Sequence, residues 1–220
     1  MTTGGQNRLD GAGRAAPRPG TMGGMYVPAH FAASPDDIAA LLDGAHVVDL
    51  VSPTAGGLIA TPLPMLLEGT SLVGHVARNN PHWRDAVAGE SLVIARGPDA
   101  YVSPSWYATK REHGRVVPTW NYLTAHVYGE LVVHDDVEWL RALVTRLTER
   151  HELTRPRPWS VTDAPAAFIE GQLRAIVGVE LRITRLEAKA KLSQNRVEAD
   201  RAGVIAGLDG HPIAGLMRER

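Results

Sequence analysis

Residues 119–134, TWNYLTAHVYGELVVH, form the clearest strand pattern in the chain and decide its fold. Successive side chains of a strand point to opposite faces, so alternate residues share a face. One face is mostly small and aliphatic: Asn121, Leu123, Ala125, Val127, Gly129, Leu131 and Val133. The other is amphipathic and aromatic: Trp120, Tyr122, Thr124, His126, Tyr128 and Glu130. The first face suits a barrel interior and the second a buried interface, so we predict a long strand that is only partly exposed to solvent.

Shorter strands are predicted on the N-terminal side of this segment. They cover residues 45–52, 58–67, 71–77 and 91–97, which are rich in β-formers and separated by Gly, Pro and Asn. Pro62 and Pro64 cannot donate ladder hydrogen bonds. Their strand is therefore predicted to lie at a sheet edge or to bend there.

Helices are predicted at the periphery. One begins at Ser34–Pro35 and ends at Gly44, because Ser caps a helix, Pro suits its first turn and Gly its end. A helical turn is predicted within 81–87. A second helix begins at Asp135 or Asp136 and has a buried apolar stripe from Val137 to Leu147. A third covers 165–175 and directs Phe168, Leu173 and Ile176 toward the core.

The last strand begins near Ile176, and its apolar phase slips by one residue between Ile183 and Leu186. Since the side-chain period of a strand is two, this slip requires one extra residue. We predict a β-bulge near Thr184–Arg185.

Many strands with few peripheral helices indicate a mainly β, α+β fold, a β-barrel with helical additions. Residues 1–24 are rich in Gly, Ala, Arg and Thr and are predicted to be a disordered leader, with Met25 as an alternative start. Residues 25–195 form the barrel domain. Residues 196–220 are charged and mixed, and we predict a tail with a short helix to Ala202 followed by loose chain.

The composition excludes several classes of function. The 220 residues carry a net charge of −1 and include no cysteine. The absence of cysteine excludes disulfides, thiolate metal sites and a cysteine nucleophile. It is also in keeping with a reducing cytoplasm. No basic stripe marks a DNA-binding surface, and no apolar run is long enough for a membrane span. Phosphate-loop, dinucleotide, zinc-protease and nucleophile-elbow motifs are absent, and the nine histidines lack ligand spacing. No metal site is predicted.

Four polar–aromatic clusters stand at strand ends, where loops carry function. They are Ala60–Pro64, Gly74–Asn80, Tyr101–Tyr107 and Val117–Tyr122. Together they offer what flavin mononucleotide (FMN) requires, flat apolar faces for the ring and donors for its edges and phosphate.

By residue type, Arg78 is the best phosphate ligand, assisted by Asn79, Asn80 and Thr61. The alternatives stay open: residues 78–81 also read as a solvated turn. Trp106, Tyr107, Trp120 and Tyr122 also read as core or dimer packing, and His75 and His126 as satisfied strand histidines.

At these residues the chain resembles the PaiB-like family, described as FMN-binding negative transcriptional regulators. The resemblance runs from Met25 to about Asn195. It is carried by the motifs Gly74–Pro81, Ser103–Tyr107, Val117–Tyr122 and Lys191–Asn195.

The resemblance implies a flavin-reductase-like split β-barrel that works as a homodimer with FMN at the subunit interface. It places Thr61, Pro62 and Leu63 against the ring, and His75, Arg78 and Asn79 near the ribityl phosphate. Trp120, Asn121 and Tyr122 approach from the partner subunit, and Lys191 and Gln194 stand at the rim. Pro64 and Met65 depart from related oxidases, which tend to carry a basic residue there.

Three functions stay open from the sequence. The first is a flavin-dependent redox or flavin-sensing protein, which leaves an FMN-dependent oxidoreductase open but names no catalytic residue. The second is a transcriptional regulator acting through DNA or a partner; direct DNA binding is not expected, because neutralising phosphates needs clustered Lys and Arg. The third is a cofactor-free dimeric interaction module.

Overall fold

The computed structural model describes residues 23–44, 47–87 and 89–220. Most of the expected leader (1–24) and the first residues of the strand expected at 45–52 lie outside this described part. The strands are β1 (Val48–Thr54), β2 (Gly57–Leu63), β3 (Met65–Glu68), β4 (Ser71–Ala77), β5 (Glu90–Val102), β6 (Thr119–His134) and β7 (Ile176–Lys191). The α-helices are α1 (Pro35–Gly44), α2 (His82–Asp85), α3 (Thr109–His113), α4 (Val137–Glu152), α5 (Ala166–Arg174), α6 (Glu198–Gly207) and α7 (Pro212–Arg218). Short 3₁₀ turns cover Ala29–Phe31 (η1), Pro104–Trp106 (η2) and Val161–Asp163 (η3).

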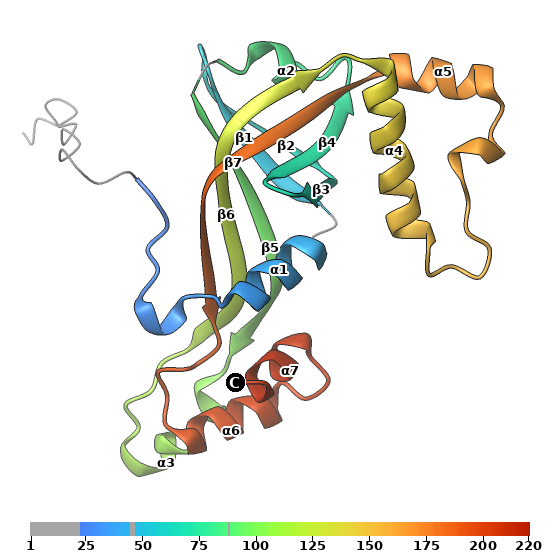
Figure 1. The fold of residues 1–220 in the computed structure, drawn as a ribbon. Helices are drawn as coiled ribbons and strands as arrows, with labels where there is room; N and C mark the ends of the chain where they lie inside the picture. Colours follow the sequence, from blue (N-terminus) through green and yellow to red (C-terminus); the bar gives the residue numbers. More distant parts are fainter. Residues whose placement is uncertain (1–22, 45–46, 88) are drawn as a thin grey trace, which may run out of the picture.

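The seven strands form one antiparallel sheet in the order β2-β1-β5-β6-β7-β4-β3 (Figure 1). The two edge strands, β2 and β3, are consecutive in the chain and are separated by Pro64 alone. The sheet therefore curls until its edges meet, which makes a barrel. Gly74 allows this closure, because a Cβ at that position would lie 2.7 Å from the Pro64 carbonyl oxygen. The predicted bend at the prolines is confirmed.

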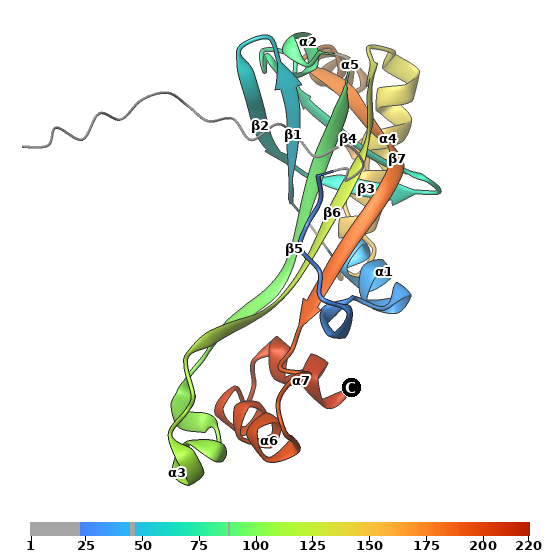
Figure 2. The same ribbon diagram turned by 90° about the vertical axis from the view of Figure 1, so that its left-hand side faces the viewer.

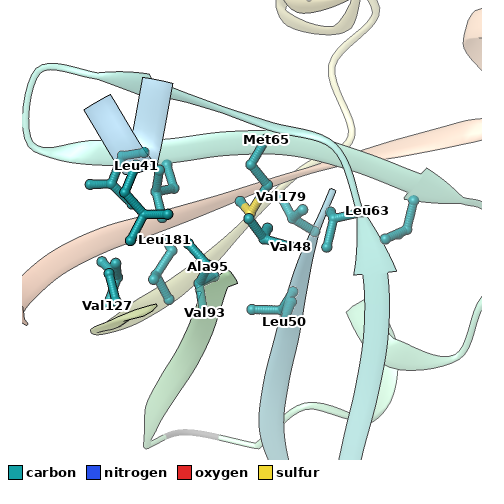
Figure 3. Close-up of a cluster of buried hydrophobic side chains, with 14 of the residues drawn as sticks. Leu41, Val48, Leu50, Leu63, Met65, Val93, Ala95, Val127, Val179 and Leu181 are labelled. Atoms are coloured by element: carbon teal, nitrogen blue, oxygen red, sulfur yellow. The ribbon is translucent and has the colours of Figure 1, made fainter. Parts of the chain in front are cut away.

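The barrel interior is filled from the predicted aliphatic face of β6. Asn121, Leu123, Ala125, Val127 and Gly129 are all buried. Two of them, Ala125 and Val127, join the main core, and Leu123 belongs to the second core near the C-terminus. The main core also contains Leu50, Val93 and Val179, which are inaccessible to solvent (Figure 3). Val133 is 39% exposed, so its predicted burial is wrong. It lies near the end of the strand, beside an open groove.

The predicted bulge in β7 is confirmed. Tyr128 pairs with Arg185 and Gly129 pairs with Ile183, so Thr184 is the extra residue. The close approach needs glycine on β6, since a Cβ at Gly129 would lie 2.2 Å from the carbonyl oxygen of Arg182.

The helix predicted over 165–175 is present as α5, but one of its buried residues was misassigned. Ile169 and Leu173, one helical turn apart, are buried, whereas Phe168 is 57% exposed. Since each helical residue advances by about 100°, Phe168 points away from the stripe that its neighbour forms with Leu173.

The segment after Gln194 is folded, so the predicted loose chain is wrong. α6 and α7 pack on the extended ends of β5, β6 and β7, away from the barrel (Figure 2). Val204, Ile213 and Met217 are at most 1% exposed and form a second core with Val102 and Leu192. Among the residues that the structure describes, none of the helices has the length and apolar character that crossing a membrane requires.

Candidate functional site

The residues predicted to bind FMN fall into two groups at opposite ends of the molecule (Figures 1 and 2). The barrel group, on β2, β4 and the turn before α2, consists of Thr61, Pro62, Leu63, His75, Arg78, Asn79 and Asn80. The distal group, beside the C-terminal helices, consists of Trp106, Trp120, Asn121, Tyr122, Lys191 and Gln194. One chain does not bring the two groups together.

A buried chain of hydrogen bonds crosses the end of the barrel below α2. His82 is 1% exposed; its Nδ1 lies 2.9 Å from the Thr61 hydroxyl and its Nε2 lies 2.9 Å from the Ser52 hydroxyl. Ser52 is 2.7 Å from the Ser91 hydroxyl, and the Asn80 amide donates to Thr61 at 3.3 Å. Thr61 and Asn80 are therefore held from within the barrel by a histidine that sequence analysis did not select.

Arg78 holds three segments of the chain together. Its Nη1 and Nη2 donate to the two carboxylate oxygens of Asp135 at 3.0 and 2.5 Å. Its Nε donates to the Arg174 carbonyl at 2.6 Å, and Nη2 donates to the Ile176 carbonyl at 3.1 Å. The hydrogen bond from Arg78 lowers the pKa of Asp135. Four of the five N–H groups of Arg78 thus donate to protein atoms, which leaves little of the guanidinium for a phosphate.

This arrangement predicts that Arg78 stabilises the fold rather than the ligand. Arg78→Ala and Asp135→Asn should each lower the thermal midpoint slightly. The thermal midpoint of the double variant should be no lower than that of the less stable single variant, because both substitutions break the same Arg78–Asp135 ion pair. Differential scanning calorimetry of the three variants measures this. A strictly additive double variant would show that the Arg78–Asp135 pair does not stabilise the fold. Loss of FMN affinity in Arg78→Ala but not in Asp135→Asn would show that Arg78 acts on the phosphate.

The other members of the barrel group lie on opposite faces of their strands. Leu63 is 3% exposed and belongs to the core, whereas Pro62 and Asn79 are exposed. His75 points outward from β4 into a pocket of about 330 Å³ that also includes Pro64 and Trp159. A ligand can therefore reach Pro62, His75 and Asn79 from outside the barrel, and it can also reach the partly exposed Arg78 and Asn80.

Half of the distal group is committed to internal contacts. Asn121 is fully buried, and its amide donates to the Ser193 hydroxyl at 3.0 Å. The Gln194 amide donates to the Ala190 carbonyl at 2.6 Å. The Trp106 ring lies against α6 at Gly207. These three side chains shape the C-terminal layer, and Asn121 is closed to a ligand, whereas Trp106 and Gln194 stay partly exposed.

Trp120 and Tyr122 remain accessible on the outer face of β6. They line a groove of about 510 Å³ that also includes Arg96 and His126. Trp120 is 52% exposed, and Lys191 donates to its carbonyl oxygen at 2.5 Å. Burial, together with Lys189 and Arg196, lowers the pKa of Lys191. This groove combines aromatic faces with one cationic and one acidic group, Arg96 and Asp99.

His82 and Trp159 have prominent positions in the structure that local sequence patterns did not predict. His82 gave no signal beyond its place in an Asn-Asn-Pro-His turn. Trp159 lies in a loop of alternating Pro and Arg. A large aromatic residue outside any predicted strand or helix was the signal that could have identified it. In the described part of the chain, no three His, Cys, Asp or Glu side chains gather as a metal site would require.

Burial lowers the pKa of His75, His82 and His126 from the ordinary value of 6.5. Below pH 6.5 these three histidines bind protons more readily in the unfolded chain than in the folded chain. The free energy of unfolding should therefore fall as the pH drops below 6.5 and through the pKa values of the folded chain. Urea unfolding at pH 7.5, 6.5 and 5.5 measures this. An unchanged free energy of unfolding from pH 7.5 to 5.5 would contradict it.

Comparison with known proteins identifies relatives for most of the chain. The model of a family described as "Putative FMN-binding domain" matches residues 25–185. The protease synthase and sporulation protein PAI 2 of Bacillus subtilis is 34% identical over 203 residues, covering 89% of this chain and 95% of that protein. An uncharacterized protein of Aspergillus fumigatus is 37% identical over 194 residues, covering 70% and 74% of the two chains.

Two solved structures share the fold at low sequence identity. The flavocytochrome Anf3 from Azotobacter vinelandii is 17% identical with a TM-score of 0.52, covering 77% of this chain and 73% of that one. The FAD and heme binding protein from Mycobacterium smegmatis is 19% identical with a TM-score of 0.53, covering 77% of each chain. The fold is therefore the split β-barrel expected from the sequence.

Proposed function

The chain belongs to the FMN-binding domain family, and on that premise we propose that it works as a homodimer that holds FMN between the barrel group of one subunit and the distal group of the other. The support is the separation of the two groups, each of which offers only part of a binding site. If the barrel end of one subunit contacts the distal end of its partner, two-fold symmetry repeats that contact once more. Each dimer would then hold two equivalent flavins.

The accessible residues fit the ring of FMN better than its phosphate. Flat surfaces stand at both ends, with His75 in the barrel pocket and Trp120 in the distal groove. With Arg78 bound to Asp135, the phosphate falls to the exposed Asn79 and to the partner subunit's Lys191. The Lys191 ammonium donates to the Thr119 hydroxyl and the Trp120 carbonyl, which leaves its third N–H for the phosphate. Bound FMN supplies electron and hydride transfer. The chain's own residues bind the ring, fix its orientation and exclude water.

We assign the protein to redox or flavin-sensing chemistry rather than to direct DNA binding. Its net charge is −1, and the long central strands β5, β6 and β7 carry acidic and basic residues together. Affinity for DNA depends on clustered cations that release counterions from the phosphates. Purified protein should therefore give no sequence-specific, salt-sensitive shift of DNA in a gel assay, and such a shift would favour a directly binding regulator.

Complementation between two defective variants tests the shared site. The distal variant is Trp120→Ala combined with Tyr122→Ala, and the barrel variant is His75→Ala combined with Asn79→Ala. Each variant alone should lose FMN binding in both of its sites. In a mixed dimer, one site receives both defects and the other receives none, so mixing should restore about one flavin per heterodimer.

Equilibrium dialysis against FMN, after exchange of the subunits, measures the restored sites. The wild-type protein is expected to bind one FMN per subunit and to scatter light as a dimer. Failure to restore binding in verified heterodimers would place each flavin within one subunit. A monomeric wild-type protein would also exclude the shared site, and absence of FMN binding would favour the cofactor-free interaction module.

A further inference from the structure

Trp159 lies at the rim of the barrel pocket without being buried by it. The segment between α4 and α5 projects from the side of the barrel (Figure 1). It brings Trp159 to a pocket of about 330 Å³ whose other walls are Pro64, His75 and the last turns of α4. The Trp159 side chain is still 46% exposed. The indole combines a large apolar face with a polar N–H, and its position at the pocket leaves that face available to a ligand.

The backbone around Trp159 is fixed on both sides. Its N–H donates to the Glu152 carboxylate at 3.0 Å, and Glu152 also pairs with Arg155 at 3.2 Å. On the other side, Ser160 and Asp163 form a capping box that starts η3. The indole is therefore attached to an ordered segment, and a preordered aromatic residue binds a ligand with little loss of conformational entropy.

Rings form one part of the pocket wall, and the polar side chains Thr148, His151 and Glu152 of α4 form another part. The Trp159 indole, the His75 imidazole and the Pro64 ring are flat or compact surfaces, and Leu147 adds an aliphatic wall. Glu152, the acidic group at the pocket, is already bound to Arg155 and to the Trp159 backbone. The volume is at the lower end of the roughly 300–1,000 Å³ of small-molecule sites, so it suits a ring system better than a whole nucleotide.

We propose that this pocket takes a flat heteroaromatic ring and, resting on the proposed function, that the ring is the isoalloxazine of FMN stacked on Trp159. The barrel subunit then supplies a face of the flavin site from the α4–α5 segment, outside the strands that the sequence motifs mark. Burial keeps His75 neutral at pH 7, in keeping with a neutral ring as the occupant.

Flavin titrations of Trp159→Ala test this assignment. Loss of one stacking partner should weaken FMN binding roughly tenfold. Riboflavin has the same ring but no phosphate, so its binding should weaken by the same factor. Trp159→Phe should recover most of the affinity. Phe168→Ala is the matched control, because Phe168 is 57% exposed on α5, next to the same segment, and does not line the pocket.

Quenching of flavin fluorescence gives the affinities, and the thermal midpoint of each variant confirms that it is folded. Wild-type affinity in Trp159→Ala would overturn the stacking, as would a loss that affects FMN but not riboflavin. Equal loss in Phe168→Ala would also overturn it, because the effect would then come from the segment as a whole. A wild-type protein that binds neither flavin would instead overturn the proposed function itself.

Discussion

Gly203→Ala is expected to lower the free energy of unfolding by about 3 kcal/mol, at the upper end of the usual effect of overpacking. A Cβ at Gly203 would lie 2.0 Å from the carbonyl oxygen of Trp106, far inside van der Waals contact. The obstacle is backbone, so it cannot rotate away as a flexible side chain would. α6 must move off η2, and that movement opens the second core around Val204 and Ile213.

Gly215→Ala is the matched control for this prediction. Gly215 also lies in a helix of the C-terminal layer, but a Cβ there would meet no atom within 4 Å. Since alanine favours a helix over glycine by about 1 kcal/mol, this variant should be slightly more stable than the wild type. Urea unfolding of both variants measures the difference. Wild-type stability in Gly203→Ala would show that α6 is not held against the Trp106 turn.

Local patterns predicted the strands well because their information lies in adjacent residues. The alternation from Thr119 to His134 matches β6 from end to end, and the phase slip in β7 placed the bulge at Thr184. The prolines near the end of β2 marked a bend. Each of these features follows either from the two-residue side-chain period of a strand or from the backbone N–H that proline lacks. Both can be seen directly in a single sequence.

Features that depend on distant partners could not be predicted in the same way. The tail carries its apolar residues on two short helices, neither of which has a long enough stripe to signal burial. Arg78 reads as a free cation from its neighbours alone, yet its partner Asp135 is 57 residues further along the chain. The motif positions were informative, but the role of each side chain was decided by contacts between segments.

The candidate site also combines features that local sequence predicts with features that depend on distant segments. Alternation along β2 and the curvature of the barrel put Leu63 inside and Pro62 outside, although both stand in one motif. Trp159 reaches the pocket beside His75 through a long segment between helices, which no local pattern foretells. Sequence motifs therefore located the region of the site, whereas the fold decides which of its side chains a ligand can touch.

His82→Leu is expected to cost about 3 kcal/mol of the free energy of unfolding. Leucine fills most of the space of the imidazole, so the loss is polar and not chiefly a cavity effect. The hydroxyls of Thr61 and Ser52 would each lose the bond to the imidazole and keep one partner, Asn80 and Ser91 respectively. Each hydrogen-bonding capacity left unmet in the buried barrel end costs about 1–3 kcal/mol. Urea unfolding at pH 7.5, where the wild-type histidine is neutral, measures the effect.

A double-variant cycle with Ser52→Ala separates this polar loss from general disturbance of the barrel. In the wild type, Ser52→Ala leaves the His82 Nε2 without its partner; in the His82→Leu background that partner is already gone. The second substitution should therefore cost clearly less in the variant than in the wild type. His82→Leu should also weaken the loss of stability between pH 7.5 and 5.5, since one of the three histidines that resist protonation is removed. Additive costs together with an unchanged pH dependence would mean that the hydrogen-bond chain does not hold the barrel end, and that Thr61 and Asn80 are positioned by the backbone alone.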